Sequence, residues 1–173
     1  VVRTYASEER DFDRCLLANK DPRRPFELKY PARAQGLNKW TWDMQRNGVH
    51  CIEDAKVFAG FDGAVVPPGA YRARVSVGGL SQELAFNLVT DPPVTATPEE
   101  ISTWTERVNE TAALLDTVLR RLGEARKAQG QIEALMADYA DDKELQQAGA
   151  AAVAANQAWD AQLVQPLHET YED

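Results

Sequence analysis

The chain has 173 residues, enough for one or two small domains, and its 44% hydrophobic and 27% charged residues are ordinary for a globular protein. The formal net charge of −8 argues against nucleic acid and against an anionic membrane surface, because both are bound through clustered Lys and Arg. No apolar run approaches the roughly 20 residues that a membrane-spanning helix needs. The chain opens on Val1 without a signal-peptide pattern, and we expect it to be a piece of a larger protein.

The first 95 residues are expected to form short strands separated by turns. A charged stretch at 7–25 is interpreted as a connection, and Gly78 with Gly79 predicts the tight turn of a hairpin. Short strands bounded by turn residues predict an antiparallel β-sandwich of the immunoglobulin or fibronectin type III kind. Alternating β-forming residues place the strands at 2–6, 26–30, 39–44, 70–77 and 80–89.

Trp40 and Trp42 alternate with polar residues and are expected to share one face of the sheet with Met44. Two tryptophans at this spacing are typical of the core of a half-buried sheet. Exposed aromatic side chains also bind sugars and peptides, so a binding platform that includes Tyr71 remains a second interpretation.

The chain changes character at 91–95, and the remainder has helical spacing. Thr97 is expected to cap a helix that has Pro98 in its first position and continues past Gly130 to about Tyr139. Residues 96–173 hold 15 Asp and Glu against 6 Lys and Arg, which we interpret as a solvated acidic helix surface.

A second helix is expected to be capped by the acidic pair at 141–142 and to stop at Pro166. A long helix, a tight turn and a second helix predict an antiparallel hairpin. The fold class is therefore α+β in two parts, with a sandwich at 1–95 and a helical hairpin at 96–173. The expected apolar stripe of the second helix consists of Leu145, Ala148, Ala152, Ala155 or Asn156, Trp159 and Leu163.

The small residues of that stripe would let a partner helix approach closely. A hairpin of two helices buries only one seam and needs further support from the sandwich, a third helix or another chain. Trp104 and Trp159 are therefore possible interface residues in a bundle between chains.

Chemistry-bearing patterns are scarce. His50, Cys51, Glu53 and Asp54 bring metal-binding residue types together, but their spacing fits no known zinc pattern and a polar loop explains them equally well. No nucleophile elbow and no phosphate-binding loop occurs in the sequence. We therefore predict no catalytic, cofactor-binding or metal-binding residue. Cys15 and Cys51 can form at most one disulfide, and the sequence leaves open whether they meet.

Four segments stand out in order along the chain, at 2–5, 31–44, 67–75 and 91–95. Together they resemble the C-terminal region of large bacterial proteins with sortilin-like or BNR-repeat β-propellers, a family labelled glycosyl hydrolases or exo-sialidase-like proteins. In that family an immunoglobulin-like sandwich follows the propellers and a helical segment follows the sandwich. The supposed hydrolytic residues would lie on the propellers, so the resemblance carries none to this chain. It implies export to the periplasm or cell surface, where a Cys15–Cys51 bridge is permissible.

These observations favour a non-catalytic accessory or scaffold module that packs against the N-terminal propellers of its parent or contacts another protein. The first alternative is a sandwich that binds carbohydrate or peptide through exposed Trp40, Trp42 or Tyr71. The second is oligomerisation through the helical hairpin. No cofactor, nucleic acid or membrane insertion is expected.

Overall fold

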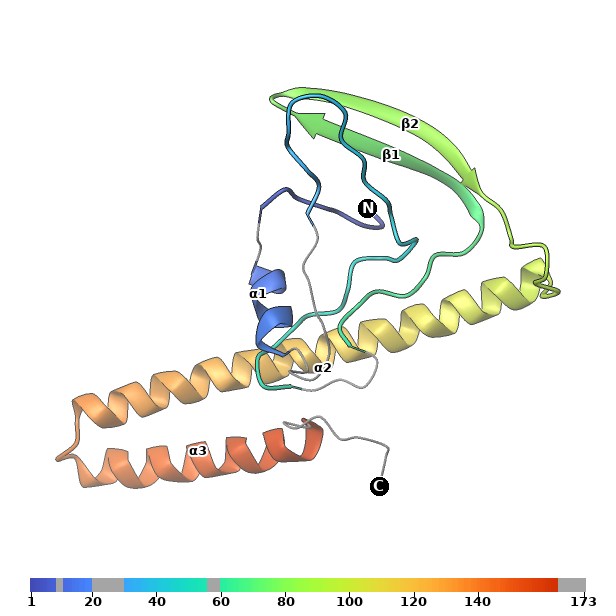
Figure 1. Cartoon of the computed structure of the whole chain (residues 1–173). Helices are drawn as coiled ribbons and strands as arrows, with labels where there is room; N and C mark the ends of the chain where they lie inside the picture. Colours follow the sequence, from blue (N-terminus) through green and yellow to red (C-terminus); the bar gives the residue numbers. More distant parts are fainter. Residues whose placement is uncertain (9–10, 20–29, 56–59, 165–173) are drawn as a thin grey trace, which may run out of the picture.

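The computed structural model describes residues 1–8, 11–19, 30–55 and 60–164 (Figure 1). A short helix, α1, covers Asp11–Ala18, and a β-hairpin follows with strands β1 (Gly69–Val77) and β2 (Leu80–Leu88). Two helices complete the chain, α2 at Pro98–Asp138 and α3 at Lys143–Leu163. Figure 1 shows α2 as a long rod, with α3 beside its C-terminal half and α1 between the rod and the hairpin. None of the described helices combines the length and low polarity that a membrane crossing requires.

Helix α2 forms as the sequence predicts. Thr97 accepts a hydrogen bond from the amide of Glu100, whose side chain accepts one from the amide of Thr97 in a capping box, and Pro98 occupies the first turn. The helix runs for 41 residues and remains continuous through Gly130, as expected.

Helix α3 begins where the sequence predicts. The Asp142 side chain accepts hydrogen bonds from the amides of Glu144 and Leu145 at the start of the helix. The helix returns along α2 to form the expected antiparallel hairpin and ends at Leu163. Pro166, the predicted stop, lies outside the described residues.

The predicted β-sandwich is wrong, because the described residues contain a single two-stranded antiparallel sheet. The hairpin at 70–77 and 80–89 is present, and its turn residues Gly78 and Gly79 have φ values of 55° and 84°. The predicted strands at 2–6 and 39–44 do not form a ladder. Residues 26–29 of a further predicted strand lie outside the described part of the chain.

Local geometry explains why 39–44 does not pair as a strand. Met44 has a left-handed φ of 59°, which turns the backbone out of the extended conformation. Beyond it, an isolated bridge joins Gln45 to Val65. The amides of Val66, Arg46 and Val49 donate to the carbonyls of Met44, Ala64 and Phe61 respectively. The chain that follows Met44 therefore runs antiparallel to 61–66 through scattered hydrogen bonds, without a continuous strand ladder.

The first helix is a further correction, because α1 lies within the stretch 7–25 that the sequence analysis treated as a connection. Its first turn contains Asp11 and Asp13, which suit the positive end of a helix dipole. With only 8 residues it would be marginal alone, so tertiary contacts have to hold it.

The core lies where the irregular loops meet the middle of α2. Leu119 and Leu122 of α2 are 3% and 1% exposed. They pack in one cluster with residues from the other side of the predicted boundary at 95/96, and the two halves of the chain therefore share a core. The loop members of the cluster are Val49, Ile52, Ala55 and Phe61.

Candidate functional site

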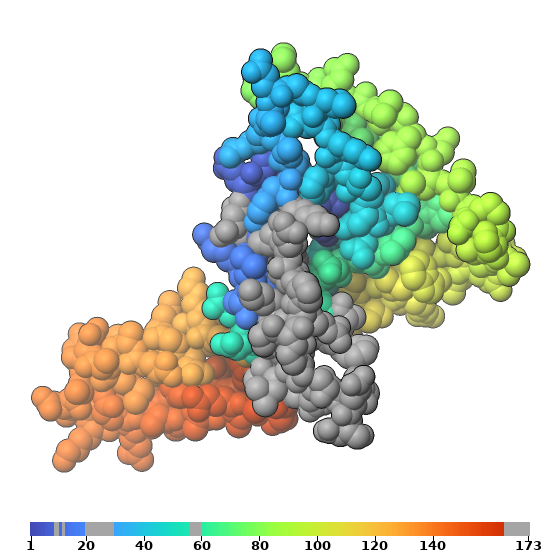
Figure 2. Space-filling model, viewed as in Figure 1, coloured from blue at the N-terminus to red at the C-terminus, as the bar shows by residue number. Residues whose placement is uncertain are grey.

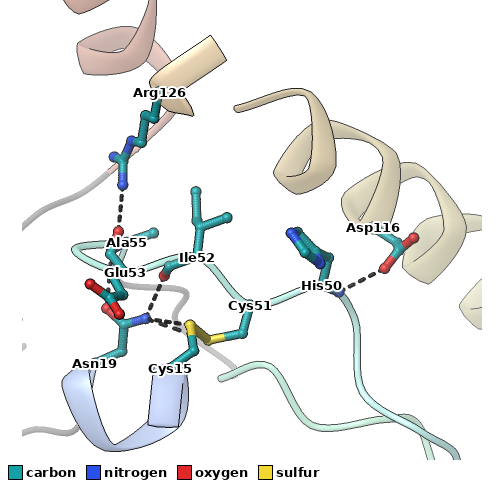
Figure 3. Close-up of a disulfide and its surroundings, with 9 residues drawn as sticks. All are labelled: Cys15, Asn19, His50, Cys51, Ile52, Glu53, Ala55, Asp116 and Arg126. Carbon is teal, nitrogen blue, oxygen red and sulfur yellow. Dashed lines mark hydrogen bonds between the residues drawn. A yellow bond between two sulfur atoms is a disulfide. The ribbon is translucent and has the colours of Figure 1, made fainter. Parts of the chain in front are cut away.

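The most highly organised part of the molecule is the segment 49–55, which we call the docking loop. A disulfide joins Cys51 in this loop to Cys15 in α1 (Figure 3). The sequence left this pairing open, and the structure contains it. The bond links residues 36 positions apart and fixes α1 against the loop.

Asn19 reinforces the disulfide from the end of α1. Its side chain is nearly buried, at 7% exposure, and uses both ends of the amide. Nδ2 donates to the carbonyl of Ile52 and lies 3.5 Å from both sulfur atoms, whereas Oδ1 accepts from the amide of Ala55 at 3.1 Å (Figure 3). A buried amide satisfied in this way specifies one loop conformation.

On its opposite side the docking loop is bound to α2. The amide of His50 donates to Asp116 Oδ1 at 2.7 Å, and the Arg126 guanidinium donates to the carbonyl of Glu53 (Figure 3). Arg126 also donates to Asp160 of α3, with Nη2 2.8 Å from Oδ1. One guanidinium therefore connects α2, α3 and the docking loop.

These contacts perturb the charged groups that make them. The hydrogen bond from Arg126 lowers the pKa of Asp160, and the same bond raises the pKa of Arg126. Burial alone would raise the pKa of Asp116, but hydrogen bonds from the Arg120 side chain and the His50 amide outweigh it and lower that pKa. Each group is stabilised in its charged form, as expected of structural ion pairs rather than of a general acid or base.

The possible metal ligands in this loop are not brought together as a set. The sulfur of Cys51 is committed to the disulfide, and Glu53 and Asp54 are exposed. Figure 3 shows the His50 ring and the Cys51 sulfur directed to different sides of the loop. Among the described residues no group of three or more His, Cys, Asp or Glu is arranged to hold a metal ion.

The predicted aromatic residues divide into separate places. Trp42 is half-buried, and its ring centroid lies 5.7 Å from that of Tyr71 and 6.2 Å from that of Phe86 on the hairpin. Trp40 is 38% exposed, and its ring centroid lies 4.9 Å from that of Tyr5 in an edge-to-face arrangement. The structure therefore does not join Trp40, Trp42 and Tyr71 into one platform.

The two other tryptophans lie on helices and are exposed. Trp104 near the start of α2 has 51% of its surface accessible, and Trp159 near the end of α3 has 41%. Trp104 lies near the start of α2, whereas Trp159 is next to Asp160, which binds Arg126 farther along α2, so the two tryptophans do not form one surface.

An apolar surface on the hairpin was not foreseen, because the sequence analysis assigned this face to a sandwich core. Trp42 covers only the end of the face that carries Tyr71 and Phe86. Beyond that end the face is open, and its aliphatic side chains are 65% to 79% exposed. The open hairpin face consists of Val75, Val77, Leu80 and Leu84.

Sequence reasoning also missed the residues that hold the docking loop. Arg126 had a usable signal, because it follows Leu122 by one helical turn and so places a charge beside the buried stripe of α2. Such a charge predicts a buried partner. Asn19 gave a weaker indication of its role, because it follows Cys15 by one helical turn and so lies on the same side of the chain as that cysteine.

In comparisons with known proteins, no family model, curated protein or solved structure matches this chain.

Proposed function

We propose that this chain is a non-catalytic accessory module of a larger exported β-propeller protein, and that it mediates packing within that protein or contact with another one. The observation that carries the proposal is the docking loop. Three polar side chains outside the loop, those of Asn19, Asp116 and Arg126, hold it to distant segments of the chain. A module built in this way is suited to holding other parts of a protein in place and not to catalysis.

The disulfide supports the exported setting. Structural disulfides persist in oxidising compartments and are rare in the bacterial cytosol. Cys15 is 7% exposed and its bond is surrounded by satisfied polar groups, which favours a structural role over a catalytic one.

The open hairpin face supports a contact function. A contiguous apolar surface on a folded protein generally marks a site of interaction. We expect the propeller region of the parent to cover it, because the resemblance to the propeller family includes the hairpin segment at 67–75.

The genomic reading frame upstream of Val1 gives the first test. The proposal expects this frame to encode BNR-type propeller repeats and, further upstream, an export signal. An unrelated upstream sequence would remove the basis for the parent assignment.

A binding experiment gives the second test. We expect the separately produced propeller region to bind the chain in isothermal titration calorimetry, and Leu84→Lys to abolish binding because it puts a charge in the open hairpin face. Ser76→Lys is the matched control, since residue 76 points to the other face of the same strands. Equal binding by both variants, or no binding by the unmodified chain, contradicts the proposal.

Carbohydrate or peptide binding is the second candidate, favoured by the exposed ring of Trp40 beside the half-buried Tyr5. A variant that keeps Trp40 as its single tryptophan should emit as an exposed indole and change its emission when glycans or peptides are added. Trp42 as the single tryptophan is the control and should not respond. A Trp40 signal unchanged across a ligand panel argues against this candidate.

A further inference from the structure

A second group of polar contacts, separate from the docking loop, joins the start of the chain to the segment 40–47. Arg3 donates a hydrogen bond to the carbonyl of Arg46 at 2.6 Å, and the amide of Thr4 donates to Asn47 Oδ1 at 3.0 Å. The Arg3 side chain is only 15% exposed, so this connection is anchored from inside. Figure 2 shows the light-blue stretch of the chain that contains this segment at the surface, beside the green hairpin.

Tyr5 is the central side chain of this group. Its hydroxyl donates to Asp43 Oδ1 at 3.1 Å, and the guanidinium carbon of Arg3 lies 5.2 Å from its ring centroid in a cation–π contact. Burial and the hydrogen bond to Asp43 raise the pKa of Tyr5, so the phenol stays protonated and remains a donor. The ring is therefore fixed both at its face and at its hydroxyl.

The indole of Trp40 packs against this fixed ring and stays open to solvent. The two rings meet edge to face, with centroids 4.9 Å apart and an interplanar angle of 67°, and Trp40 is 38% exposed. An edge-to-face contact leaves at least one face of the indole free of Tyr5. A flat aromatic surface that is already held in one orientation can stack on a ligand ring at a low cost in conformational entropy.

Asp43 supplies unused hydrogen-bonding capacity close to the indole. Its Oδ1 accepts from the Tyr5 hydroxyl and from the amide of Gln45 at 3.0 Å. Its Oδ2 lies 3.8 Å from Arg3 Nη2, too far for a hydrogen bond, and no other residue in the described part of the chain donates to it. The Asp43 side chain is 46% exposed, so Oδ2 is open to a ligand. Because Trp40 contacts the ring of Tyr5 and Asp43 binds its hydroxyl, about the length of one phenol ring separates the indole from the carboxylate.

This combination of groups favours a neutral sugar over a peptide. A carboxylate accepts hydrogen bonds and donates none, so Asp43 pairs with hydroxyl groups, which a sugar ring carries around its edge. A peptide presents donors and acceptors in alternation, but the side-chain donors of Arg3 and Tyr5 are directed at groups of the protein itself. The charge of Asp43 also disfavours sugars that carry carboxylate groups.

We propose that Trp40 and Asp43 form a binding site for one neutral sugar ring of an oligosaccharide, with the ring stacked on the indole and its hydroxyls donating to Asp43 Oδ2. Tyr5 and Arg3 position these two groups. The proposal rests on the second candidate function and gives it a ligand class and contact residues. The open hairpin face takes no part in it, so its failure would leave the accessory role intact.

Isothermal titration calorimetry of the full chain with cellohexaose, mannohexaose and chitohexaose tests this site, and at least one of these neutral oligosaccharides should bind. Trp40→Ala should weaken that binding by about tenfold or more, because the stacking surface is lost. Asp43→Asn should weaken it by about tenfold, because a charge-assisted hydrogen bond becomes a neutral one. Trp104→Ala and Asp91→Asn are the matched controls, since both residues are exposed elsewhere on the chain, and these variants should bind as the unmodified chain does.

A further variant separates ligand contact from folding. Tyr5→Phe keeps the ring beside Trp40 and removes only the hydroxyl that holds Asp43, so it should weaken sugar binding while the far-ultraviolet circular dichroism spectrum stays the same. Sugar binding that is unaffected by Trp40→Ala or by Asp43→Asn overturns this site but leaves carbohydrate binding by the chain in place. Binding of random hexapeptides without any of the sugars overturns the sugar site in favour of peptides. No binding of either ligand class refutes both the site and the second candidate function.

Discussion

Leu122 is the side chain whose truncation should reveal most about how the two halves depend on each other. It is 1% exposed and packs with Leu119 against the apolar residues of the docking loop. Replacing Leu122 by Ala removes apolar carbons worth about 0.8 kcal/mol each, roughly 2.4 kcal/mol in total. The cavity left behind adds to this, and we expect the free energy of unfolding to fall by about 3 to 4 kcal/mol.

Urea unfolding measures this change, with two probes. Far-ultraviolet circular dichroism follows α2 and α3, and fluorescence of a variant with Trp42 as its single tryptophan follows the hairpin side. Both transitions should move together to lower urea with an unchanged m value, because one core serves both halves. Leu114→Ala is the control, since Leu114 is on the same helix but 67% exposed, and its effect should stay within about 1 kcal/mol. A Trp42 transition that does not move, or equal effects of the two substitutions, would refute the idea of a shared core.

Reduction of the disulfide between α1 and the docking loop should lower the free energy of unfolding by about 3 to 4 kcal/mol, as expected for a link between residues 36 positions apart; an unchanged urea midpoint in reductant contradicts this. Gly63→Ala should destabilise the protein by about 2 kcal/mol or more, because the added methyl group collides with the backbone carbonyl of Arg46. Gly130→Ala adds its methyl group in open space within α2 and should stabilise the protein by up to about 1 kcal/mol. The melting temperatures of the two variants should therefore shift in opposite directions. Asp160→Asn should cost about 1 to 2 kcal/mol at pH 7. Because Arg126 lowers the pKa of Asp160 in the folded state, the stability that the ion pair contributes is complete above the unfolded pKa of about 3.9. It is lost as the pH falls through the lower folded pKa. A difference in unfolding free energy between Asp160→Asn and the unmodified chain that persists below that range contradicts the ion pair.

The helical half could be predicted from sequence because its signals are local. The cap at Thr97, the proline after it and the cap at Asp142 each act within one turn of a helix. The hairpin was predictable for the same reason, since Gly78 and Gly79 define its turn.

The strand-rich half could not be predicted in the same way, because sheets depend on partners far away in the sequence. The alternation of Trp40, Trp42 and Met44 predicts one buried face, but only Trp42 is half-buried. Trp42 meets Tyr71 and Phe86 through its ring and not through a backbone ladder. Periodicity shows which residues share a side and does not show what lies against them.

The docking loop was unpredictable for a related reason. Arg126 is 73 residues from Glu53, and Asp116 is 66 residues from His50. The orientation of α3 shows the same limit. Most of its expected apolar stripe is exposed, and Gly149 and Asn156 lie on the side that meets α2.

The order of these partners along the chain has a consequence for biosynthesis. Val49, Ile52 and Phe61 are made before Leu119 and Leu122, the residues that will cover them. At about 5 to 20 residues per second, a separation of 66 to 73 residues leaves the apolar side of the loop uncovered for roughly 3 to 15 seconds. Cys15 and Cys51 both precede α2 in the chain, so in an oxidising compartment the disulfide can fix the loop to α1 before α2 packs against it. Once formed, that bond restrains the loop against misfolding until Leu119 and Leu122 cover it.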